Sequence, residues 1–171
     1  MSSAAAGAVH VGLGGNLGDP ERTFVSAVEE LERLEDVSVL RCSSLYAAAA
    51  LGPSQPEFRN AVIALQSRRT PESLLALLLE VERAHGRVRG ERWGPRVLDL
   101  DILLWGDRIV DLPGLRIPHP ELHRRRFALE PLAEVAPEAR HPVLQKTVSE
   151  LLEGVRDQRV QRLEPAVWRS R

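Results

Sequence analysis

Hydrophobic and polar residues follow two different periods along the chain, and these periods predict strands and helices in a regular order. Apolar residues that alternate or run together indicate strands, and apolar residues that recur every three or four positions indicate helices. Asp19-Pro20 and Thr70-Pro71 each pair a good N-cap residue with proline at the first helical position, so each begins a predicted helix. The predicted strands are 9–13, 37–46, 58–65, 96–105 and 108–110, and the predicted helices are 20–35 and 71–85.

The main elements follow the order strand, helix, strand, strand, helix, strand, and a C-terminal extension of short elements comes after them. This order predicts an α+β fold of the ferredoxin-like βαββαβ type, an antiparallel sheet with helices on one face. The 171 residues are 43% hydrophobic, which suffices for one core, so we expect a single domain over 1–171. Residues 1–7 lack the basic start and apolar core of a signal peptide and are expected to be a disordered tail.

Two aspartates interrupt the apolar run R-V-L-D-L-D-I-L-L-W at 96–105. In an extended chain Asp99 and Asp101 project from the same face, where neighbouring carboxylates repel unless a positive charge compensates them. Magnesium takes one or two carboxylates and leaves its other positions to water and substrate phosphates. The pair therefore predicts a magnesium site, and the alternative is a surface pair salt-bridged to Arg96 or Arg108.

A basic loop leads directly into the strand that carries the aspartates. Arginines at 83, 87, 89, 92 and 96 share this segment with a single acidic residue, Glu91. The planar guanidinium group makes paired hydrogen bonds to phosphate oxygens, so arginines beside a cation site indicate metal-bound polyphosphate. The alternative is an ordinary solvated basic loop.

Composition excludes several other classes of function. The formal net charge of −1 gives no global argument for binding nucleic acid or a membrane surface, and no segment approaches membrane-spanning length. Lys146 is the only lysine and lies in Q-K-T, so the chain has no P-loop. The single cysteine, Cys42, cannot form an internal disulfide, which agrees with a reducing cytoplasm.

Three weaker signals allow a plain structural interpretation. The segment G-L-G-G-N-L-G at 12–18 has leucine where a dinucleotide fingerprint needs its third glycine, so we interpret it as a structural turn. His119 and His123 lack a zinc pattern, and nucleotide contact or packing is expected for His119. Phe58 and Phe127 on their own are more often core residues. Together the residues indicate a magnesium-dependent nucleotide enzyme.

Four longer stretches resemble one enzyme family: L-G-G-N-L-G-D, Q-P-E-F-R-N-A-V, G-R-V-R-G-E-R-W-G-P-R-V-L-D-L-D-I and I-P-H-P-E-L-H-R-R-R-F. They resemble the 6-hydroxymethyl-7,8-dihydropterin pyrophosphokinases of folate biosynthesis, and the likeness runs from residue 9 to about 152. The resemblance implies a ferredoxin-like fold and transfer of the β,γ-pyrophosphoryl unit of ATP to the pterin hydroxymethyl oxygen, with release of AMP. ATP is then the co-substrate and two Mg²⁺ ions are expected. We expect a cytoplasmic monomer that acts on these small molecules and binds neither nucleic acid nor membrane.

The resemblance also implies roles for individual residues. A catalytic role is implied for Arg87, Arg96, Asp99 and Asp101, with both aspartates binding metal. Pterin binding is implied for Ala48, Leu51, Phe58, Asn60, Trp93 and Phe127. ATP binding is implied for Glu82, Arg89, Arg92, Arg96, Ile102, His119 and Arg125. The loop at 86–95 is expected to close over the site when both substrates bind.

The chain departs from the family pattern at three places. Gly15 stands where serine is common, Phe58 stands where tyrosine is frequent, and four alanines at 47–50 replace a stretch that usually carries threonine and proline.

Two other function classes stay open at this point. A ferredoxin-like RNA-binding module needs an aromatic strand motif that is absent, and aromatic residues total only 4%. A regulatory nucleotide-binding domain without turnover is the other alternative, and release of AMP distinguishes the enzyme from both.

Overall fold

The computed structural model describes residues 7–50, 54–86, 95–163 and 168. Within these residues one antiparallel sheet organises the fold, with two small hairpins beside it. The strands of the sheet are β1 (Val9–Gly15), β2 (Val37–Cys42), β3 (Tyr46–Ala48), β4 (Phe58–Ser67), β5 (Asp99–Trp105) and β10 (Val160–Arg162). The hairpin strands are β6 (Val110–Leu112), β7 (Leu115–Ile117), β8 (Arg140–His141) and β9 (Lys146–Thr147).

The predicted ferredoxin-like order is confirmed. Neighbouring strands run β5–β1–β4–β2, and every pair is antiparallel. Helix α2 (Pro20–Glu32) connects β1 to β2, and α3 (Pro71–Ala84) connects β4 to β5. Strands β3 and β10 continue the sheet beyond β4, so that the C-terminal segment pairs with the middle of the chain.

Both long helices begin where their capping residues predict. The side chain of Asp19 accepts a hydrogen bond from the backbone N–H of Arg22, and the side chain of Thr70 accepts one from Ser73. Proline occupies the first helical position of each helix. Helix α3 ends at Ala84, and Gly86 adopts a φ of +85°, the left-handed conformation that glycine allows after a helix.

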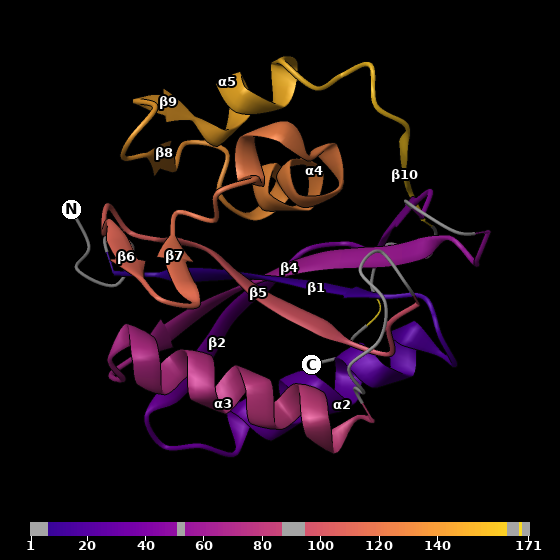
Figure 1. Ribbon diagram of the computed structural model, residues 1–171, viewed down its shortest axis with the longest axis vertical. Helices are drawn as coiled ribbons and strands as arrows, with labels where there is room; N and C mark the ends of the chain where they lie inside the picture. The colour runs from indigo at the N-terminus through magenta and orange to yellow at the C-terminus, as the bar shows by residue number, and fades with distance from the viewer. Residues whose placement is uncertain (1–6, 51–53, 87–94, 164–167, 169–171) are drawn as a thin grey trace.

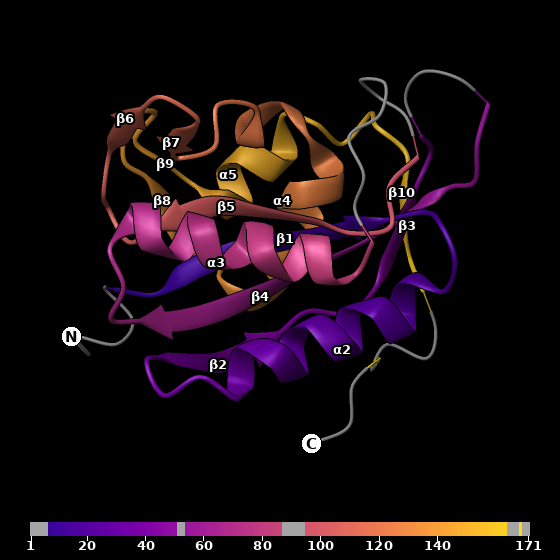
Figure 2. The ribbon, with the colours of Figure 1, turned by 60° about the horizontal axis from the view of Figure 1, so that its bottom comes forward.

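Hydrophobic layers cover both faces of the sheet. Helices α2 and α3 pack on one face, below the sheet in Figure 1, around Phe24, Leu31 and Leu78. The extension supplies the second layer with 3₁₀ helix η1 (Leu122–Arg124), α4 (Arg126–Val135) and α5 (Val148–Glu153). Figure 2 shows the hairpins β6–β7 and β8–β9 together at one end of the molecule, away from β3 and β10. The extension thus covers the face that α2 and α3 leave open.

Several predicted boundaries were wrong by a few residues. The first helix ends at Glu32 rather than at 35, and the strand predicted over 37–46 is two strands, β2 and β3. The residues between them turn toward β4, where the backbone N–H of Ser43 donates to the carbonyl of Val62. Strand β4 continues to Ser67, and the strand predicted over 108–110 is β6, which begins at Val110 and pairs with β7. Among the described residues no helix is long and apolar enough to cross a membrane.

His10 gives a testable pH dependence of stability. It lies on β1 between Ala64 and Leu104, is only 8% exposed, and its Nδ1 has no partner among the described residues. Burial lowers its pKa to about 4. Below pH ~6.5 His10 therefore binds a proton in the unfolded chain but not in the folded chain, and the free energy of unfolding falls as the pH drops toward 4. We expect the free energy of unfolding to fall by about 1–2 kcal/mol more between pH 7 and pH 5 in the parent than in His10→Leu. Denaturant unfolding of both proteins at pH 7 and pH 5 measures the difference. An equal loss of unfolding free energy in the parent and in His10→Leu would contradict the prediction.

Candidate active site

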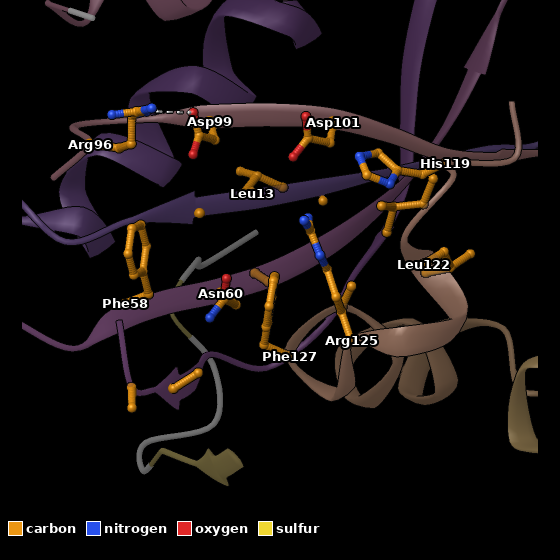
Figure 3. Close-up of a pocket in the computed structure, with 17 residues that line it drawn as sticks. Leu13, Phe58, Asn60, Arg96, Asp99, Asp101, His119, Leu122, Arg125 and Phe127 are labelled. Carbon is orange, nitrogen blue, oxygen red and sulfur yellow. Dashed lines mark ion pairs between the residues drawn. The ribbon is translucent and has the colours of Figure 1, made fainter. Parts of the chain in front are cut away.

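The two aspartates lie side by side on β5. Asp99 and Asp101 are directed to one side of the strand, where they face the pocket (Figure 3), while Leu100 and Ile102 are buried in the core on the other side. The predicted common face of the carboxylates is therefore confirmed. Asp101 is exposed, and Asp99 is partly buried with 28% of its side chain accessible.

Glycines of β1 lie directly across from the aspartates. Gly14 pairs with Asp99, and Gly12 pairs with Asp101. The interpretation of these glycines as a turn was wrong, because β1 continues through Gly15. A Cβ on Gly14 would lie 3.4 Å from Oδ1 of Asn60, and a Cβ on Gly15 would lie only 2.5 Å from the carbonyl oxygen of Val97. Glycine at position 15 therefore lets the backbone of Val97 approach this strand closely, whereas a Cβ at position 14 would make only an ordinary contact.

Two aromatic rings and an amide form another part of the pocket. Phe58 and Asn60 are two positions apart on β4, and Phe127 enters from the start of α4 (Figure 3). Asn60 is 6% exposed, and its buried Nδ2 has no hydrogen-bond partner among the described residues. An unsatisfied buried amide is costly, so this nitrogen suits a ligand that brings an acceptor.

Cationic groups approach the carboxylates from two directions. Nε of Arg96 lies 3.8 Å from Oδ1 of Asp99, and the backbone N–H of Arg96 donates to the Asn16 side chain at 2.9 Å. Arg125 reaches into the pocket from the side of α4, with its guanidinium carbon 5.5 Å from the ring centre of Phe127. The alternative partner Arg108 instead lies 4.9 Å over the ring of Trp105. The salt-bridge interpretation thus holds for Arg96 and Asp99, but the pair still faces a pocket.

His119 lies beside Asp101 at the far end of this pocket (Figure 3). Its Nδ1 accepts a hydrogen bond from the backbone N–H of Glu121 at 3.1 Å. The pKa of His119 is lowered, first by burial and then by the charge of Arg125, against an opposing effect of Glu121. At neutral pH the ring is therefore uncharged. Because Nδ1 accepts a hydrogen bond, the one N–H hydrogen of the ring is on Nε2, which can donate.

These side chains surround one cavity of about 380 Å³, a volume within the usual range for small-molecule sites. It brings together most of the predicted residues that the structure describes: Ala48, Phe58, Asn60, Arg96, Asp99, Asp101, His119, Arg125 and Phe127. Residues from β1, β3, β4, β5 and α4 meet here, so the cavity depends on the whole sheet and on the extension.

Two predicted ATP-binding residues do not line the cavity. Glu82 is 2% exposed on α3, and its Oε2 accepts a hydrogen bond from the backbone N–H of Leu100 at 2.7 Å. Ile102 is buried in the core because alternation turns it away from Asp101. Five further predicted residues lie outside the described part of the chain: Leu51, Arg87, Arg89, Arg92 and Trp93. The expected loop closure at 86–95 also falls mainly on undescribed positions.

Sequence reasoning missed a set of small and apolar lining residues: Gly12, Leu13, Gly14, Ala49, Ala61, Leu103, Leu122 and Ala128. Only the glycine-rich segment offered a signal, and it was interpreted as a turn. The apolar members resemble ordinary core positions in sequence, so their place on a cavity follows only from the packing.

Comparison with known proteins agrees with this geometry. The family model for 7,8-dihydro-6-hydroxymethylpterin-pyrophosphokinase (HPPK) matches residues 10–137. A 2-amino-4-hydroxy-6-hydroxymethyldihydropteridine pyrophosphokinase of Synechocystis sp. is 44% identical over 145 residues, covering 85% of this chain and 74% of the relative. The protein of the same name from Pseudomonas aeruginosa is 46% identical over 135 residues, covering 78% and 83%.

A solved structure supports the fold. The crystal structure of Plasmodium falciparum HPPK-DHPS wild type with pteroate has a TM-score of 0.67 and 14% sequence identity. The match covers 86% of this chain but only 42% of that longer chain. At this identity the likeness supports the architecture alone, while the family model and the sequence relatives carry the assignment. The chain belongs to the 7,8-dihydro-6-hydroxymethylpterin-pyrophosphokinase family.

Proposed function

We propose that this chain transfers the β,γ-pyrophosphoryl group of ATP to the hydroxymethyl oxygen of 6-hydroxymethyl-7,8-dihydropterin, with release of AMP, in folate biosynthesis. The observation that carries the proposal is one cavity with two chemically different parts. One part offers aromatic rings and a buried amide, and the other offers two carboxylates beside arginines (Figure 3). The named relatives, which are pyrophosphokinases, support the same reaction.

The aromatic part suits a flat, polar heterocycle. Phe58 and Phe127 provide ring faces on which a pterin can stack, and the Asn60 amide can hydrogen-bond to its edge. Binding would give the buried Nδ2 of Asn60 an acceptor. Ala48 on β3 also lines the cavity, and its small side chain takes up little of the space. The pterin would thus be held with its hydroxymethyl group toward the carboxylates.

The charged part suits the triphosphate of MgATP. The donor set fits magnesium, because Asp99 and Asp101 offer two hard oxygen ligands and leave the other positions to water and phosphates. When bound, magnesium, with two ions expected, would supply positive charge that offsets the charge of the phosphates. Asp99 and Asp101 would hold the cation, while Arg96 and Arg125 would donate hydrogen bonds to phosphate oxygens. Positioning and charge neutralisation are the main demands of phosphoryl-type transfer.

The other assignments are part of the proposal. We propose that Glu82 acts indirectly, by fixing the backbone of β5 at Leu100, next to both aspartates. Leu51, Arg87, Arg89, Arg92, Trp93 and Ile102 remain predicted site residues. We further propose a single-domain cytoplasmic monomer that acts on small molecules. We propose that it binds neither nucleic acid nor membrane, in agreement with the formal net charge of −1.

Product analysis tests the function directly. The purified chain with ATP, magnesium and 6-hydroxymethyl-7,8-dihydropterin should release AMP and the pterin diphosphate in equal amounts. Omission of the pterin is the control and should suppress AMP release. Release of ADP would contradict pyrophosphoryl transfer, and ATP binding without any product would favour a regulatory nucleotide-binding domain.

A further inference from the structure

The start of helix α4 carries two of the cavity side chains, yet it lacks a capping side chain of its own. Arg125 is the N-cap residue, with φ −121° and ψ 104°, and its side chain makes no capping hydrogen bond. That side chain enters the cavity instead, as does the ring of Phe127 two residues later (Figure 3). The first backbone N–H groups of a helix have no partner within the helix, so this end needs one from elsewhere.

Gln158, from the segment before β10, supplies that partner. Its Oε1 accepts a hydrogen bond from the backbone N–H of Arg126 at 2.9 Å, and its Nε2 donates to the carbonyl of Arg124 at 2.7 Å. One amide side chain thus binds the backbone on both sides of Arg125. It gives the first N–H group of α4 a hydrogen-bond partner, and at the same time it restrains the rotation of the backbone at Arg125.

A reciprocal set of contacts holds Gln158 in place. The guanidinium of Arg126 donates to the carbonyl of Gln158 at 2.6 Å and to that of Arg156 at 3.1 Å. The same group pairs with Glu130 one helical turn further along, with Nε 2.8 Å from Oε2. We call these five residues, Arg124, Arg126, Glu130, Arg156 and Gln158, the clasp. The clasp ties the C-terminal segment to the helix end that carries Arg125 and Phe127.

We propose that Gln158 is a positioning residue for pyrophosphoryl transfer, acting through Arg125 without touching either substrate. Gln158 does not line the cavity, and it lies beyond residues 10–137, the part that matches the family model. Because the arginine side chain is long, a small rotation of the backbone at its base displaces the guanidinium by more than the rotation displaces the backbone. Misplacement by about 1 Å can reduce a reaction rate about 100-fold. The C-terminal segment of this chain thus helps to orient Arg125, the arginine proposed to bind phosphate.

The inference rests on the proposed reaction, and a double-mutant cycle separates it from a general effect on folding. Gln158→Ala removes both hydrogen bonds, and Gln158→Glu keeps the acceptor for Arg126 but loses the donor to Arg124. Each is made in the parent and in Arg125→Ala, and kcat and KM for both substrates are measured together with Tm. Gln161→Ala is the matched control, because Gln161 is exposed on β10 three residues further along.

In the parent we expect Gln158→Ala to lower kcat/KM by about 5- to 50-fold and Gln158→Glu to lower it less. In the Arg125→Ala background the same substitutions should lower kcat/KM by less than about a further twofold, because the guanidinium that Gln158 orients is already absent. Gln161→Ala should match the parent. If Gln158→Ala lowers only Tm, or costs the same factor with and without Arg125, the proposal is wrong. A parent that releases no AMP would instead contradict the proposed function.

Discussion

Asp99→Asn and Asp101→Asn should each lower pyrophosphoryl transfer by about three orders of magnitude or more, because metal binding and charge neutralisation are lost together. Both carboxylates face the cavity from one side of β5, and Arg96 lies 3.8 Å from the first of them. An amide keeps nearly the same shape but has no negative charge for the cation. Steady-state release of AMP at several magnesium concentrations measures the loss.

The same variants should remain folded. Two neighbouring carboxylates repel each other, so removal of one charge relieves this repulsion in the metal-free protein. The ion pair of Asp99 with Arg96 is partly exposed and contributes little, about 0–1 kcal/mol. We therefore expect Tm without magnesium to equal or exceed that of the parent for Asp101→Asn and to stay close to it for Asp99→Asn.

Asp107→Asn is the matched control, because Asp107 is an exposed turn residue after β5. Its activity and Tm should follow the parent at every magnesium concentration. If an aspartate variant unfolds readily while its folded fraction transfers pyrophosphate normally, the two carboxylates are structural ion-pair partners and the site assignment is wrong.

Phe58→Ala should weaken pterin binding by about 1–3 kcal/mol, the usual range for stacking of a flat base on an aromatic ring. Phe58 lies on β4 beside Asn60, and Phe127 provides the second ring of the cavity. ATP affinity should change little, because Phe58 lies at the aromatic part and the phosphates are expected at the aspartates. Calorimetric titration with the pterin and, separately, with a non-hydrolysable ATP analogue measures both affinities.

Phe58→Tyr serves as its control, since it keeps the ring and adds only a hydroxyl at a position where the family often has tyrosine. Its pterin affinity should stay close to that of the parent. Unaltered pterin affinity in Phe58→Ala would assign this ring to packing alone.

Local patterns in the sequence determined a large part of the fold. Asp19 and Thr70 cap their helices as expected, because a cap depends only on residues one turn away. The common face of Asp99 and Asp101 follows from the alternation of side chains along a strand. The order of the elements predicted the antiparallel sheet, whose pairing β5–β1–β4–β2 the structure confirms. The candidate pterin residues, in contrast, came from the family resemblance.

Only the tertiary structure decided which distant residues share the cavity. The glycines of β1 resembled a turn, and pairing with β4 and β5 places them in a strand beneath the site. Glu82 resembled a ligand residue, but its carboxylate is buried against the backbone of Leu100.

Gln158 carries no sequence signal for its contacts, because it meets Arg124 and Arg126 more than thirty residues away along the chain. Periodicity in the sequence indicates which face of a helix or strand a residue lies on. The residue that it contacts on that face depends on strand register and on the packing of the extension, and neighbouring residues in the sequence do not determine either.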